Sequence, residues 1–181
     1  MCNNCNYTIH GRNHHFGWDN SFVPAEKVAP GSTIFFECLD SSGGQISPES
    51  TVGDIAKLDF AKVNPVTGPI YVDGAEPGDA LKVTIEEFKP SGFGWTANIP
   101  GFGLLADDFN EPALTIWQYD AVKMGPALFG KHGRVPLKPF AGTIGVAPAE
   151  TGLHSVVPPR RVGGNLDIRD LSAGTTLYLP V

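Results

Sequence analysis

The sequence has few charged residues and no long apolar run. Charged residues make up only 18% of the 181 residues while 41% are hydrophobic, a balance that excludes a disordered, highly charged chain. The net charge is −6 and no basic stripe is present, so nucleic acid is not an expected partner. No apolar run approaches the roughly 18 residues of a membrane span, so we expect no membrane association.

Cysteine is also scarce. The chain has 3 cysteines, an odd number, so a disulfide framework is not expected. The first residues lack the basic and apolar regions of a signal peptide, which favours the cytoplasm. Cys2 and Cys5 have the spacing of half a zinc site, and the alternative is a pair of free thiols. A complete zinc site would need further ligands from His10, His14, His15 or Cys38.

Glycine and proline, in contrast, are abundant and are spread between apolar segments. The 22 glycines and 16 prolines indicate a turn-rich β-protein. A turn followed by a strand is predicted three times, with turns at 28–32, 75–79 and 172–174 and strands at 33–38, 80–88 and 175–181. In the first two turns, proline followed by glycine suits a type II turn, where glycine supplies the positive φ.

The middle strand has the clearest pattern. Leu81, Val83 and Ile85 alternate with polar residues, the period of two expected of a half-buried strand. Other predicted elements are strands at 69–72, 113–119 and 142–146, a short helix at 51–58 capped by Ser50 or Thr51, and a long loop at 124–138. Many short strands joined by glycine and proline turns predict a mainly β fold, either a sandwich or a barrel.

The length favours one domain with a second, smaller lobe. The last residues, 177–181, resemble a strand without a polar tail. Because an unpaired strand edge is a liability, we expect more protein to follow them.

Two segments near the amino terminus carry candidate chemistry. His14, His15 and Asp19 bring imidazoles and a carboxylate together, as in a general base or a metal ligand, unless this is a solvated segment in which Trp18 packs. Glu37 and Asp40 lie at the end of a predicted strand before two glycines, where carboxylates build metal or substrate sites.

Each candidate has a plainer alternative. The segment around Asp40 can be an ordinary hairpin in which Asp40 bonds its own backbone, with Cys38 a small buried hydrophobe. Asn165 and Asp167 follow two glycines and can form a nest for a cation or an oxyanion, or only a turn. The chain has no Gly-x-Ser-x-Gly elbow, P-loop or dinucleotide fingerprint, so the residues do not choose a reaction.

The order of several motifs resembles the acetamidase/formamidase family. The most specific stretch is Gly-Pro-Ile-Tyr-Val-Asp-Gly-Ala-Glu-Pro-Gly-Asp at 68–79. Other matching segments are 28–37, Asp40 with 45–46, 99–105, 142–148, 163–167 and 177–181, so the resemblance covers the chain from about Trp18 onward.

The resemblance implies a jelly-roll-like β-sandwich with a smaller β-barrel-like lobe, the latter within about residues 50–140 of a family region covering 1–181. It implies hydrolysis of short aliphatic amides, such as formamide and acetamide, to ammonia and a carboxylate. A divalent metal, zinc foremost, and a homo-oligomer are also implied. The implied catalytic and metal-binding residues are His15, Glu37 and Asp40, and the implied substrate contacts are Gln45, Asn165 and Asp167.

Two departures from the family pattern accompany the resemblance. Asn64 stands where many members have a histidine. The family also continues into a segment with Gly-Asp-x-His and Gly-Asp-Gly-Glu patterns that this sequence does not contain. The alternative to an amidase is therefore a non-catalytic β-sandwich module that binds a ligand or serves assembly.

Overall fold

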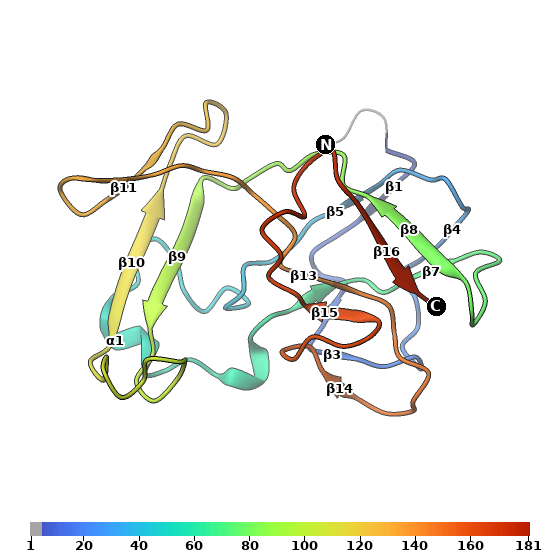
Figure 1. Cartoon of the computed structure of the whole chain (residues 1–181), viewed down its shortest axis with the longest axis horizontal. Coiled ribbons are helices and arrows are strands. Elements are labelled where there is room, and N and C mark those ends of the chain that lie inside the picture. The colour runs from blue at the N-terminus through green and yellow to red at the C-terminus, as the bar shows by residue number, and fades with distance from the viewer. Residues whose placement is uncertain (1–4) are drawn as a thin grey trace. The chain divides into compact units, whose positions relative to one another are not determined.

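The structure is mainly β, as the sequence predicts. The computed structural model describes residues 5–181 and is 31% strand and 4% helix (Figure 1). Among these residues the strands pair in twos, and no closed barrel forms. The predicted barrel-like lobe is thus not a closed barrel, while the jelly-roll arrangement stays a prediction.

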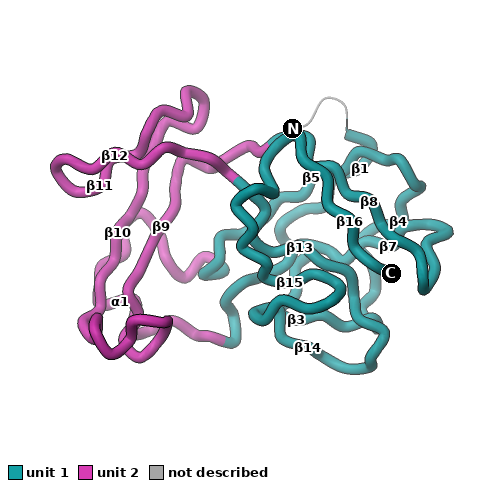
Figure 2. The backbone as a smooth tube through the Cα atoms, in the orientation of Figure 1, with its two compact units in different colours: residues 1–43, 61–87, 140–181 teal, residues 44–60, 88–139 magenta. Residues whose placement is uncertain are grey.

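The chain divides into two compact units, coloured separately in Figure 2. Unit 1 comprises residues 1–43, 61–87 and 140–181, and unit 2 comprises 44–60 and 88–139. Unit 2 is therefore built from two separate stretches of sequence, each flanked by residues of unit 1.

Unit 1 is assembled from short strands that pair over long sequence separations. Its strands are β1 (Tyr7–Ile9), β2 (His14–His15), β3 (Gly17–Trp18), β4 (Glu26–Val28), β5 (Ile34–Phe36), β6 (Val66–Thr67), β7 (Ile70–Val72), β8 (Ala80–Thr84), β13 (Thr143–Gly145), β14 (His154–Ser155), β15 (Gly163–Asn165) and β16 (Thr176–Pro180). The pairs β1–β5 and β4–β7 are parallel. The pairs β2–β6, β3–β14, β8–β16 and β13–β15 are antiparallel.

All three predicted turns precede strands, and two of those strands pair with each other. The amide of Asp79 donates to the Glu76 carbonyl at 3.0 Å, which closes the turn before β8, and Gly78 supplies a φ of 103°. A similar turn before β16 is closed by Thr175. β8 and β16 lie side by side (Figure 1). In their register Leu81 faces Leu179, so the predicted alternation matches the more buried face.

Unit 2 contains one short helix and two strand pairs. Its elements are α1 (Val52–Ile55), β9 (Phe93–Asn98), β10 (Ala113–Gln118), β11 (Ala127–Phe129) and β12 (Gly133–Val135), and the 3-10 helix η1 (Phe60–Lys62) follows at the boundary. The Thr51 amide donates to the Asp54 carboxylate at 2.8 Å, which confirms the predicted cap. Neither helix of the described chain has the length and apolar character needed to cross a bilayer.

One prediction in unit 2 is wrong. The stretch 124–138, expected to be a long loop, contains the β11–β12 hairpin. The many glycines and prolines there make the turn and flank the strands. Gly130 begins the turn with a φ of 58°, and Gly133 begins β12 opposite Phe129. Because each strand has only three residues, no period of two was visible in the sequence.

The core of unit 1 contains a close backbone approach that only glycine permits. A Cβ on Gly163 would collide with the Ile144 carbonyl oxygen, and one on Gly164 would lie 2.9 Å from the Pro158 oxygen. Gly145, opposite Gly163, packs directly against the Trp18 indole: a Cβ at Gly145 would lie 3.2 Å from Trp18 Cη2. The strands β13 and β15 can therefore approach each other, with Trp18 buried at 5% exposure against them.

We predict that Gly163→Ala destabilises the protein much more than Gly174→Ala. Both glycines have positive φ, 105° and 88°, so both substitutions incur backbone strain of about 1–2 kcal/mol. Only the Gly163 methyl meets backbone atoms, whereas nothing lies within 4 Å at Gly174. We expect an additional loss of about 2 kcal/mol or more for Gly163→Ala in urea unfolding. Equal losses for the two variants would contradict this packing.

Candidate functional site

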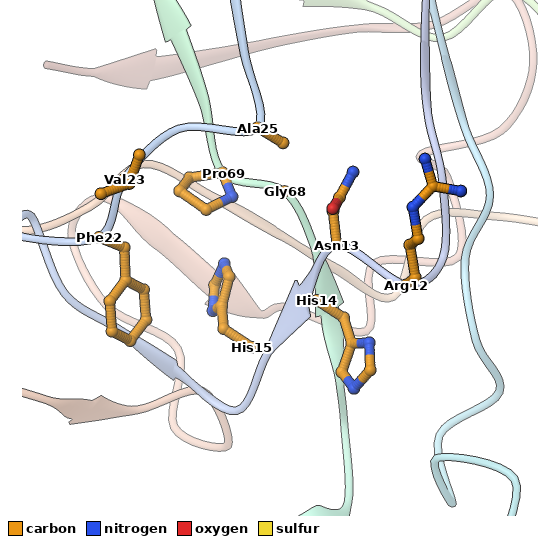
Figure 3. A pocket seen from close by; sticks show the side chains of 9 residues that line it. All are labelled: Arg12, Asn13, His14, His15, Phe22, Val23, Ala25, Gly68 and Pro69. Atoms are coloured by element: carbon orange, nitrogen blue, oxygen red, sulfur yellow. The ribbon is translucent and has the colours of Figure 1, made fainter.

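A cleft in unit 1 contains His15, one of the candidate residues from the sequence. The cleft, shown in Figure 3, has a volume of about 430 Å³. Its lining residues are Arg12, Asn13, His14, His15, Phe22, Val23, Ala25, Gly68 and Pro69. They come from two stretches, 12–25 and 68–69, that are far apart in the sequence.

Backbone hydrogen bonds hold these two stretches together. In the β2–β6 pair His14 lies opposite Thr67. Immediately beyond this pair the Gly68 amide donates to the Asn13 carbonyl at 2.9 Å, and the Ala25 amide donates to the Pro69 carbonyl at 2.8 Å. The Gly68–Pro69 peptide bond is cis. Both walls of the cleft are thus fixed by the main chain.

His15 combines aromatic packing with an unpaired nitrogen. Its ring lies next to that of Phe22 (Figure 3), with 5.2 Å between the ring centroids, and its centroid lies 6.0 Å from that of the Trp18 ring. Its buried Nδ1 has no hydrogen-bond partner, as is also true of the indole Nε1 of Trp18. Burial lowers the pKa of His15 below 6.5, and the charge of His14 acts in the same direction against an opposing backbone contact with Gly17. The imidazole is therefore neutral near pH 7 and can accept a proton.

The neighbouring His14 is held differently. Its Nδ1 lies 2.8 Å from the Gly11 carbonyl oxygen, which can only accept, so Nδ1 carries the proton. Its ring packs edge-on against Phe16 at 5.3 Å. His14 is exposed and has its Nδ1 engaged, whereas His15 is half-buried and has its Nδ1 unpaired.

Glu37 is part of a carboxylate–imidazole pair. Its Oε2 lies 2.9 Å from His10 Nδ1 and accepts the Gly11 amide at 3.3 Å. These hydrogen bonds, with a smaller contribution from the charge of Arg12, lower the pKa of Glu37. The carboxylate orients His10, which the sequence analysis considered only as a possible ligand to zinc.

Asp40 organises the turn that follows. Its Oδ1 accepts the Ser42 amide at 2.8 Å and also the Ser42 hydroxyl, and its carbonyl accepts the Gly43 amide. Ser42 is fully buried. The plainer alternative, in which Asp40 bonds its own backbone, therefore describes these contacts. The companion expectation for Cys38 is wrong, because β5 ends at Phe36 and Cys38 is exposed.

Asn165 and Asp167 lie together beside β13. The Thr143 hydroxyl donates to Asn165 Oδ1 at 2.9 Å, and Asn165 Nδ2 donates to Asp167 Oδ2 at 3.3 Å. The Gly142 carbonyl accepts the Asp167 amide. Gln45 belongs to unit 2, where its side-chain amide makes two hydrogen bonds with the Asp59 backbone, at 2.7 and 3.2 Å.

The predicted metal ligands His15, Glu37 and Asp40 belong to no cluster of potential ligands in the part of the chain that the structure describes. Among residues 5–181, no three histidine, cysteine, aspartate or glutamate side chains gather as ligands would. Glu37 is hydrogen-bonded to His10 and Asp40 to Ser42. The expectation of a free thiol at Cys5 is wrong, because Cys5 is disulfide-bonded and so offers no thiolate to zinc. Cys2 lies outside the described residues.

A model of the acetamidase/formamidase family matches residues 4–156. The chain belongs to the acetamidase/formamidase family. The match includes the cleft residues, Glu37 and Asp40, and ends before Asn165.

Solved structures of the acetamidase/formamidase type share the fold. The acetamidase from Bacillus halodurans is 34% identical with a TM-score of 0.88, over 96% of this chain and 57% of that one. A predicted acetamidase/formamidase from Thermoanaerobacter tengcongensis is 32% identical with a TM-score of 0.87, over 97% of this chain and 56% of that one.

Curated relatives extend well beyond the region they share with this chain. The formamidase of Methylophilus methylotrophus is 30% identical, over 92% of this chain and 54% of that protein. The acetamidase of Mycolicibacterium smegmatis is 28% identical, over 92% of this chain and 56% of that protein. The chain thus spans about half the length of the curated relatives it matches. The alignment with the Methylophilus formamidase runs over 220 residues, more than the 181 of this chain. The Methylophilus protein therefore has insertions in the shared region.

Arg12, Asn13 and Phe22 line the cleft as well, although their positions were not predictable from the sequence. No local signal marks them, because they become neighbours of Gly68 and Pro69 only through the β2–β6 pairing. The unusual adjacency of two histidines did identify the segment.

We predict that His15 makes the protein less stable as the pH falls. The imidazole of the unfolded chain takes up a proton near pH 6.5, whereas the buried one does so at lower pH. Between these values the unfolded chain binds more protons, so the free energy of unfolding decreases as the pH falls below about 6.5.

Urea unfolding of His15→Gln and the wild type from pH 7.5 to 5 tests this prediction. The difference in free energy of unfolding between the two should shift in favour of His15→Gln as the pH falls. His132→Gln serves as the control, since His132 is exposed in the β11–β12 turn. A difference independent of pH would contradict the prediction.

Proposed function

We propose that the protein hydrolyses the C–N bond of short aliphatic amides, such as formamide and acetamide, to ammonia and a carboxylate. The observation that carries this proposal is membership of the acetamidase/formamidase family, with curated relatives named formamidase and acetamidase. The chain spans about half of those relatives, so the activity of the whole protein is part of the proposal.

His15 is the general base of the proposed reaction. A water molecule attacks the amide carbonyl carbon and passes a proton to the His15 imidazole, which then returns the proton to the departing nitrogen. The C–N bond breaks and leaves a carboxylate and ammonia. The lowered pKa supports this role, because the imidazole is free to accept a proton at neutral pH.

Glu37 and Asp40 support the site in this proposal. Glu37 orients His10 and fixes Gly11, the residue before the cleft begins. Asp40 shapes the turn after β5. Catalytic roles for these two residues, and substrate contacts from Gln45, Asn165 and Asp167, stay predictions.

Zinc assistance also stays a prediction. When bound, a zinc ion would polarise the amide carbonyl and lower the pKa of its water. Because His15, Glu37 and Asp40 do not gather as a ligand set, no step of the proposal depends on zinc. The cytoplasmic location and the homo-oligomer are likewise predictions.

Ammonia release from formamide and acetamide, with and without added zinc, tests the proposed function. The assay should use the 181-residue chain and its fusion to the remaining part of the Bacillus halodurans acetamidase, of which the chain covers 57%. We expect turnover in at least one form. Folded proteins that release no ammonia in either form would contradict the amidase and favour the binding module.

We predict that His15→Gln lowers kcat by about 10²- to 10⁴-fold in the active form, because a general base contributes rate accelerations of that size. Glutamine preserves the volume and polarity of the side chain, so the cleft should survive. His132→Gln should retain the wild-type kcat. A kcat for His15→Gln within about twofold of the wild type would rule out His15 as the base.

A further inference from the structure

The cleft around His15 has one apolar end and one polar end. Phe22, Val23 and Pro69 gather at one side of the view in Figure 3, and Arg12 and Asn13 lie at the other. His15 lies between them, next to Phe22. Such a division suits a small amphipathic ligand, with a hydrocarbon part and a polar head.

Arg12 is a cation without a fixed partner. Within residues 5–181 its guanidinium forms no ion pair or hydrogen bond, although its charge is felt by Glu37. Glu37 forms no ion pair with it among the described residues, and its Oε2 is engaged by His10 and Gly11 instead. The guanidinium can therefore bind an anion in the cleft, and its planar fork matches a carboxylate.

Asn13 supplies a second polar group at the same end. Its backbone is fully used, since its amide donates to His10 and its carbonyl accepts from Gly68. Its side-chain amide makes no hydrogen bond within the described chain. In Figure 3 the side chains of Asn13 and Arg12 extend from the backbone toward the same side of the view. The fixed backbone holds an amide donor next to the cation.

We propose that Arg12 and Asn13 form a carboxylate-binding subsite of the cleft, which holds a short aliphatic carboxylate with its hydrocarbon part against Phe22 and Pro69. The inference rests on the proposed function for its role, since a carboxylate is the product of amide hydrolysis. A neutral amide of similar shape has no charge for Arg12 to recognise, so the cleft favours the product over the substrate. Product inhibition is the expected consequence.

Binding to the full 181-residue chain, followed by NMR without any turnover, tests the subsite directly. Acetate and butyrate should shift the amide signals of Asn13 and Gly68 in a saturable way, at constant ionic strength against sodium chloride. Butyrate should bind more tightly, by about two- to fourfold for each added methylene that reaches the apolar end. Acetamide should bind about tenfold more weakly than acetate, because it lacks the charge.

Matched variants separate the two ends of the cleft. Arg12→Gln should weaken acetate binding about tenfold and Asn13→Ala about threefold. Arg169→Gln removes an exposed arginine outside the cleft and should change binding less than twofold. Phe22→Leu should reduce the preference for butyrate over acetate while leaving acetate binding intact.

Three results would overturn the inference: equal shifts with chloride, wild-type affinity in Arg12→Gln, or an equal loss in Arg169→Gln. Because binding is measured without turnover, failure of the amidase assay leaves this test intact. If ammonia release is found, acetate should inhibit it competitively in the wild type and about tenfold more weakly in Arg12→Gln. Carboxylate binding without turnover would retain the subsite and contradict only the proposed function.

Discussion

The close approach of β13 and β15 is the constraint on which the rest of unit 1 depends. Gly163 and Gly164 leave no room for a Cβ, and Gly145 carries the Trp18 indole on the same strand pair. Trp18 in turn packs edge-on against His15. The position of the proposed catalytic imidazole therefore depends on Trp18, and the position of Trp18 depends on the glycines of β13 and β15.

The turns and the strands that follow them were predictable because their causes are local. Pro77 and Gly78 set the backbone angles of their own turn, and Leu81 and Val83 show their shared face through spacing alone. The capped helix at Val52–Ile55 was predictable for the same reason, since Thr51 and Asp54 lie within one turn. Its length was overestimated, as expected for the ends of a helix.

What the sequence could not predict is pairing over distance. Strands of two residues, such as His14–His15 and Val66–Thr67, carry too few positions to show any period, yet their pairing builds the cleft. The hairpin at 127–135 was missed because its glycines and prolines resemble those of a loop. For the site, local chemistry identified His15, whereas Arg12 and Asn13 acquire their position only from the neighbouring Gly68–Pro69 segment.

The pairing of β3 with β14 has a consequence for synthesis on the ribosome. Gly17 lies opposite Ser155 and Trp18 opposite His154. This strand pair therefore cannot form until residues much later in the chain have been synthesised. The two stretches that line the cleft, 12–25 and 68–69, leave the ribosome early. Trp18, which packs against His15, gains its contacts with Gly145 and the β14 strand only after these later residues have left the exit tunnel. During translation the nascent chain therefore exposes Trp18 and its apolar neighbours until the later strands have been synthesised.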